Sequence, residues 1–164
     1  MPADVAYPGD FLDSSQDACM SPESHDVGDV YPSLTYADAS AAIEWLCAAF
    51  GFERRLLVPG DDGDVRHSEL SLGRAVVMVS SPKPDQGRVA PTGHCSSALS
   101  VYVADPDAHY ERAVAHGAEV VHALQDEEYG ARGYQVLDLE GRLWYFGSYR
   151  PGRWWNTAPG TKKA

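Results

Sequence analysis

The stretch TYADASAAIEWLCAAFGF, residues 35–52, has a counterpart in VADPDAHYERAVAHGAEV, residues 103–120. In each stretch an aspartate that can cap a helix, Asp38 or Asp105, precedes apolar residues at three- and four-residue spacing. A glycine that can end the helix, Gly51 or Gly117, follows. The two aspartates lie 67 residues apart and the two glycines 66, so the chain contains the same helical unit twice.

Runs of alternating apolar residues surround each predicted helix, one before it and three after it. They predict strands over residues 31–36, 53–58, 65–72 and 75–80 in the first half, and over residues 98–103, 119–124, 134–138 and 143–149 in the second. The sequence therefore predicts an α+β fold of two tandem βαβββ modules, about residues 30–81 and 97–150. Because one helix covers only one face of a curved mixed sheet, we expect the two sheets to lie around a cavity.

Charge and composition limit the partners of this chain. A net charge of -11 and a pI near 4.8 repel nucleic acid and anionic membrane surfaces. No run approaches the roughly 20 apolar residues of a membrane span, and we expect neither a membrane segment nor a signal peptide. The three cysteines have no Cys-x-x-Cys spacing, which favours a reducing cytoplasm over a disulfide framework.

Both ends of the chain differ in composition from the domain at residues 30–150. Residues 1–29 carry seven acidic side chains and no Lys or Arg, and we interpret them as a disordered acidic tail. The alternative is an ordered arm that wraps a partner. Residues 151–164 form a C-terminal tail, in which Trp154 and Trp155 either dock on the domain or contact a second subunit.

Two strings add a resemblance to the duplicated module. They are RHSELSLG at residues 66–73 and EYGARGYQVLDLEGRLWYFG at residues 128–147. With the repeat, they make residues 30–150 resemble the vicinal oxygen chelate superfamily, which includes glyoxalase I, extradiol dioxygenases and bleomycin resistance proteins. The strings are most similar to the bleomycin-resistance-like or PhnB-like branch.

The resemblance implies four positions that hold a divalent metal in metal-dependent members, on the first and last strands of each module. Matched by caps and turns, they fall on Tyr31, Met78, Ala98 and Tyr145. A two-residue slip would replace Tyr31 by Ser33, or Ala98 by Ser100. None of these sets supplies four ligands for a hard metal, so we expect no metal and no cofactor.

His67 and Glu69 are the candidate catalytic pair, because residues two apart on a strand share a face. On the concave face they could act as base and acid, or hold a polar group of a ligand. The alternative is a solvated pair, or one satisfied within the core. His94 could join them at the cavity rim, although a loop histidine is more often only exposed.

The remaining candidates are aromatic or planar groups that suit a flat apolar ligand. Tyr145, Met78 and Tyr31 are expected to line the cavity, and the resemblance implies that the loop over residues 125–134 covers its mouth. The alternatives are core packing for Trp144 and a mobile loop without a ligand role. The predicted ligand-binding residues are therefore Tyr31, His67, Glu69, Met78, Tyr129, Arg132, Tyr134, Trp144 and Tyr145.

The leading hypothesis is a metal-free small-molecule binding protein that sequesters an aromatic or apolar antibiotic or metabolite. The alternative is an isomerase, lyase or dioxygenase that uses His67 and Glu69 as acid and base, or as part of an unrecognised metal site. We also expect a homodimer, because such modules expose long sheet edges. The sequence leaves open the identity of the ligand and whether the modules swap between chains.

Overall fold

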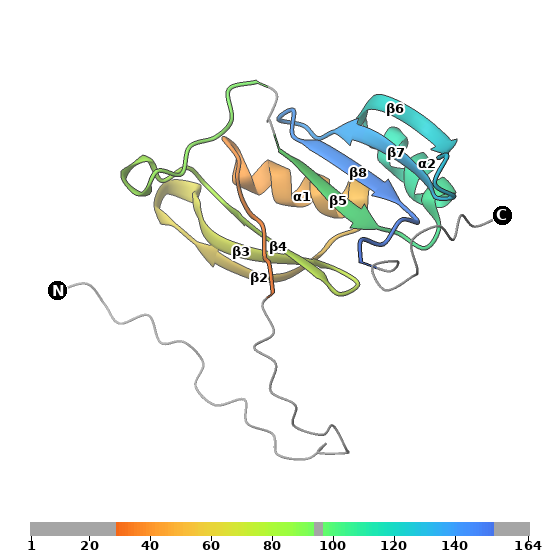
Figure 1. The fold of residues 1–164 in the computed structure, drawn as a ribbon. Coiled ribbons are helices and arrows are strands. Elements are labelled where there is room, and N and C mark those ends of the chain that lie inside the picture. Colours follow the sequence, from red (N-terminus) through yellow and green to blue (C-terminus); the bar gives the residue numbers. More distant parts are fainter. Residues whose placement is uncertain (1–28, 94–96, 153–164) are drawn as a thin grey trace, which may run out of the picture. The chain divides into compact units, whose positions relative to one another are not determined.

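The computed structural model describes residues 29–93 and 97–152 (Figure 1). The first module contains β1 (Ser33–Thr35), α1 (Ala39–Phe50), β2 (Glu53–Pro59), β3 (Val65–Leu72) and β4 (Ala75–Ser80). The second contains β5 (Ala98–Tyr102), α2 (Pro106–Ala115), β6 (Glu119–Asp126), β7 (Arg132–Leu137) and β8 (Leu143–Gly147). Short 3-10 turns occur at Asp61–Gly63 and Pro84–Gln86. The expectations for residues 1–28, His94, Trp154 and Trp155 lie outside the described residues.

Each module forms one four-stranded mixed sheet. The strand orders are β1-β4-β3-β2 and β5-β8-β7-β6, with the outer β1 and β5 parallel to β4 and β8 and the other neighbours antiparallel. This arrangement confirms the predicted α+β fold of two βαβββ modules. In the described residues, no helix is long and apolar enough to cross a membrane.

Both predicted helix starts and the predicted end of α1 are also confirmed, whereas α2 has His116 as its C-cap, one residue before the predicted Gly117. Asp38 and Asp105 accept hydrogen bonds from the backbone N–H of Ala41 and Ala108, at 2.9 and 3.1 Å. Gly51 closes α1 with φ of 76° in the left-handed region, which glycine adopts without strain. The first strand is shorter than predicted, because Pro32 has no N–H to donate to β4.

The helix-covered faces of the two sheets share one hydrophobic core. Phe50, in the last turn of α1, lies 4.6 Å from Phe146 and 5.3 Å from Trp144 between ring centroids. Trp45 of α1 donates to the carbonyl oxygen of His116, just after α2, at 2.9 Å. Helix α1, which belongs to the first module, therefore also packs against the second module.

Asp138, in the turn between β7 and β8, is the polar centre of this core. Its buried carboxylate accepts hydrogen bonds from the Tyr36 hydroxyl at 2.6 Å and the Trp144 indole at 2.9 Å. The other oxygen accepts from the backbone N–H groups of Glu140 and Arg142, both at 3.0 Å. Burial beside this carboxylate raises the pKa of Tyr36. Since Tyr36 belongs to the first module, Asp138 joins the two modules.

The same turn holds the start of α1. The carboxylate of Glu140 accepts from the backbone N–H groups of Ala37 and Asp38, at 2.8 and 3.0 Å. The guanidinium of Arg142 donates to the Thr35 carbonyl at 3.3 Å and lies 5.3 Å from the Tyr36 ring centroid. One turn of the second module thus fixes the chain of the first where β1 leads into α1.

His109 of α2 forms a second junction between the modules. Its Nε2–H donates to the Phe50 carbonyl at 2.9 Å, so Nδ1 accepts from the Tyr134 hydroxyl at 2.5 Å. Burial lowers the pKa of His109, and the charge of Arg112 lowers it further against the opposing effect of the Phe50 carbonyl. The neutral ring is therefore the form that fits the junction.

We expect Asp138→Asn to lower the free energy of unfolding by about 2 to 3 kcal/mol, measured by urea denaturation. The amide keeps one acceptor oxygen but presents an N–H₂ group to the Trp144 indole, which can only donate. Asp85→Asn, at an exposed turn, is the matched control and should change stability little. A loss no larger than that of the control would show that Asp138 does not hold the modules together.

The lowered pKa of His109 predicts how stability depends on pH. The unfolded histidine binds a proton near its ordinary pKa of about 6.5, whereas the folded one resists protonation. The contribution of His109 is therefore complete above about pH 6.5 and is lost as the pH falls below it. Urea denaturation from about pH 7.5 to about pH 5.5 should show a smaller decline for His109→Gln than for the wild type. His122→Gln, an exposed control, should keep the wild-type decline.

Candidate functional site

Each sheet leaves one face uncovered by its helix. In the first sheet, Ser33 and Glu69 lie on either side of Met78, as direct cross-strand partners. Glu69 also pairs with Leu56 of β2, which is 42% exposed. With His67, these residues form the first open face: Ser33, Leu56, His67, Glu69 and Met78.

The candidate pair His67 and Glu69 is present on the first open face. The Nε2 of His67 lies 3.2 Å from a carboxylate oxygen of Glu69, with the two side chains 35% and 44% exposed. Because an ion pair at this exposure contributes little to stability, the fold does not depend on it. Of the alternative readings, a pair satisfied within the core does not fit this exposure, whereas a solvated pair does, and both groups are accessible to a ligand.

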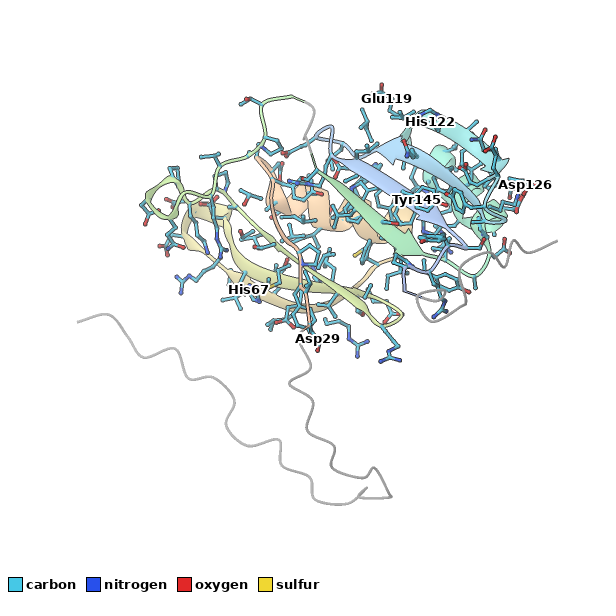
Figure 2. All side chains as sticks on the ribbon, in the orientation of Figure 1. Asp29, His67, Glu119, His122, Asp126 and Tyr145 are labelled. Carbon is cyan, nitrogen blue, oxygen red and sulfur yellow. The ribbon has the colours of Figure 1, made fainter. Side chains whose placement is uncertain are left out.

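The second open face carries Tyr145 at its centre. Ser100 and Gln135 lie on either side of Tyr145, and His122 lies beyond Gln135. Figure 2 shows Tyr145 and His122 on this sheet and His67 on the other. The second open face comprises Ser100, His122, Gln135 and Tyr145.

Two glycines make room for the ring of Tyr145 on the second open face. A Cβ atom on Gly133 would overlap the Tyr145 ring. A Cβ atom on Gly147 would meet the Tyr145 hydroxyl and would lie 2.7 Å from the carbonyl oxygen of Arg132. The Tyr145 hydroxyl lies 3.4 Å from that of Tyr129, and burial raises the pKa of Tyr145, as does this hydrogen bond. The ring therefore lies flat on the sheet with a protonated phenol.

The strand register corrects the expected metal positions. Ser33 faces Met78 and Ser100 faces Tyr145, so the residues opposite the last strands are not Tyr31 and Ala98. Two aliphatic hydroxyls, a thioether and a protonated phenol do not fit a hard divalent cation. Among residues 29–93 and 97–152, no three His, Cys, Asp or Glu side chains group as metal ligands.

Two predicted ligand-binding residues lie on the wrong side of their sheet. Trp144 is fully buried with its indole bonded to Asp138, and Tyr134 is buried with its hydroxyl on His109. Residues of β7 and β8 alternate between faces, and these two belong to the helix-covered face. A ligand on the second open face therefore cannot reach them.

Tyr129 lies in a short turn rather than a long loop, and Arg132 directly follows this turn. Residues 127–131 are the only ones between β6 and β7. Arg132 makes two hydrogen bonds of 2.9 Å to Asp107 and one of 3.1 Å to Asp126, and these carboxylates raise its pKa. Its guanidinium therefore ties β7 to α2 and β6, whereas Tyr129 is 60% exposed beside Tyr145.

The two open faces do not face each other within one chain. Each helix packs on one side of its own sheet, and the two helices contact each other in the shared core. The open faces consequently turn away from this core. Tyr31, just before β1, remains 53% exposed.

A cavity in the described part of the chain lies elsewhere, between the modules. It measures about 660 Å³ and is lined by the β3–β4 turn (residues 72–75), by residues 100–105 and by the first turns of α2. Arg74, Arg112 and Arg150 also border it. No sequence motif marks these arginines, because they are scattered along the chain.

The chain belongs to the Glyoxalase/Bleomycin resistance protein/Dioxygenase superfamily, whose profile matches residues 30–146. It is 34% identical over 121 residues to an uncharacterised protein of Mycobacterium bovis, covering 71% of this chain and 80% of that one. This chain also resembles TioX from Micromonospora sp. ML1, which is known from a crystal structure. The two sequences are 35% identical and the two structures match with a TM-score of 0.60, over 73% of this chain and 94% of TioX.

More distant relatives share the fold alone. Fosfomycin resistance protein FosX from Mesorhizobium loti is 12% identical, with a TM-score of 0.56, over 76% of this chain and 93% of that one. These similarities confirm the resemblance found in the sequence. They assign no ligand or reaction, because one fold supports many functions.

The two glycines under Tyr145 should differ in their tolerance of a side chain. We expect Gly133→Ala to lower the free energy of unfolding by about 1 kcal/mol or less, because only the mobile Tyr145 ring has to move. Gly147→Ala should cost about 1 to 3 kcal/mol, because its Cβ also meets the backbone. Urea denaturation measures both, and equal losses would mean that the Tyr145 ring is not free to swing away.

Proposed function

We propose that this chain is a metal-free binding protein that holds an aromatic or apolar small molecule against its open sheet faces. The observation that carries the proposal is the set of side chains at the four expected metal positions: Ser33 of β1 opposite Met78 of β4, and Ser100 of β5 opposite Tyr145 of β8. These groups supply contact area and hydrogen bonds but no ligands for a Lewis acid.

Each open face offers some of the side chains that a binding site for an aromatic or apolar molecule needs. Leu56 and Met78 offer apolar surface beside the polar pair of His67 and Glu69. The second face offers the ring of Tyr145, which can stack on a planar ligand. A ligand between two such faces would bury its rings and bond its polar groups at the edge.

We further propose that two chains form a homodimer in which the first open face of one covers the second open face of the other. Within one chain both faces turn away from the core, and the first exposes Leu56 to solvent. A second copy supplies a complementary sheet face and removes this apolar area from water.

The second candidate function is an enzyme that uses His67 and Glu69 as base and acid. The observation that favours it is their separation of 3.2 Å on an accessible face, which is typical of groups that exchange a proton. In that case a bound molecule would be converted, and His67 would act on it directly.

Calorimetric titration of the dimer with bleomycin and a panel of aromatic antibiotics tests the binding function. We expect at least one compound to bind, and His67→Ala and Tyr145→Ala each to weaken that binding by about fivefold or more without changing the unfolding midpoint. Glu44→Ala, on the exposed side of α1, is the control and should bind as the wild type does. Uniformly flat titrations would contradict the proposal.

The same preparation separates the remaining alternatives. Elemental analysis after addition of Ni, Mn, Fe or Zn should find no metal retained, and one tightly bound metal per chain would overturn the metal-free assignment.

Sedimentation should give about twice 17.8 kDa, and a monomer at micromolar concentration would overturn the dimer. Mass spectrometry of the bound compound should recover it unchanged, whereas a product that disappears with His67→Ala would establish the enzyme.

A further inference from the structure

Of the residues that make up the two open faces, Ser100 alone also lines the cavity between the modules. Its walls are the β3–β4 turn at residues 72–75, the end of β5 with the loop that follows it, and the first turns of α2. At about 660 Å³ it has the size of a site for a small organic molecule. Its position at the junction of the modules is one where ligand sites are common.

Three arginines from distant parts of the sequence border this cavity. Arg74 comes from the β3–β4 turn, Arg112 from α2 and Arg150 from the segment after β8. Asp105 is the single carboxylate in the lining, and it caps α2 through the N–H of Ala108. The cavity is therefore cationic, although the chain as a whole carries a net charge of -11.

His109, which also lines the cavity, adds no positive charge to that of the arginines. Both ring nitrogens of His109 are engaged, one with the Phe50 carbonyl and the other with the Tyr134 hydroxyl. Its lowered pKa agrees with a neutral ring. The positive charge of the cavity thus comes from the guanidinium groups alone.

Two of these guanidinium groups have no partner within the described part of the chain. Neither Arg74 nor Arg112 makes an ion pair or side-chain hydrogen bond there. Arg112 lies against Gly51, where a Cβ atom would overlap its guanidinium nitrogen. Arg150 is stacked over the ring of Tyr102, 3.6 Å from the ring centroid, which leaves its N–H groups at the rim able to donate.

Part of the cavity wall is apolar. Leu72, Val101 and Val103 contribute aliphatic side chains. Because β5 is the outer strand of its sheet, alternate backbone groups along it point outward without a strand partner. The site thus combines an apolar body with fork-shaped donors at its charged end.

We propose that this cavity binds a phosphate monoester whose phosphate group lies among Arg74, Arg112 and Arg150 and whose apolar body lies against the Leu72 and Val101 wall. A phosphate monoester carries nearly two negative charges at neutral pH and accepts paired hydrogen bonds from guanidinium groups. The net positive charge of three arginines and the Asp105 carboxylate matches the nearly two negative charges of a phosphate monoester better than the one negative charge of a carboxylate ligand. The site borders the second open face through Ser100, but the arginines that would hold the phosphate belong to neither open face.

Titration of the full-length protein with phenyl phosphate, followed by amide NMR, tests this proposal. We expect shifts at Gly73 and Ala104 and none at His67 or Gln135 on the open faces. Phenyl phosphate should bind at least about fivefold more tightly than inorganic phosphate or benzoate, and phenol should not bind. Equal binding of benzoate would overturn the phosphate assignment, and shifts confined to the open faces would overturn the site.

Substitutions distinguish a specific phosphate site from non-specific attraction of the phosphate to arginine side chains. Arg74→Gln and Arg112→Gln should each weaken phenyl phosphate binding about fivefold to tenfold. Arg66→Gln and Arg88→Gln remove the same charge from exposed positions outside the cavity and should leave the affinity unchanged. If Arg112→Gln fails to fold, Arg74→Gln on the exposed turn still decides, and equal losses in all four variants would overturn the proposal.

Discussion

The buried carboxylate of Asp138 is the interaction on which the arrangement of the modules depends. It accepts a hydrogen bond from Tyr36 of the first module and three from its own module, so neither module completes its core alone. A buried carboxylate is stable only when its oxygens are fully bonded, which makes the junction specific as well as strong. Glu140 extends the junction to the first turn of α1.

This junction decides where ligands can bind. It holds the helix-covered faces together around Phe50, Trp144 and Phe146, and thereby leaves both open faces for contact with another molecule. The same packing leaves a cavity where the β3–β4 turn approaches β5 and α2. The chain therefore offers an open face with apolar and polar side chains on the first sheet, one centred on Tyr145 on the second, and a cationic cavity between the modules.

Membership of the superfamily fixes the scaffold but not the chemistry that it carries. Around the conventional metal positions, this chain has hydroxyl, thioether and phenol groups in place of imidazoles and carboxylates. The His67 and Glu69 pair lies on the neighbouring strand of the same face, at the distance of a single hydrogen bond.

The sequence by itself determined the repeated module, because helix caps, turns and alternating apolar residues are local signals that act within a few residues. Strand alternation is local as well, so the sequence also put His67 and Glu69 on one face of their strand, but it left open which side of the sheet that face is. Only the tertiary structure decided that Ser33 and Ser100 face Met78 and Tyr145, because register depends on pairing between distant strands. It alone also buried Trp144 and Tyr134 and gathered Arg74, Arg112 and Arg150, because contacts between the modules join residues that no local pattern connects.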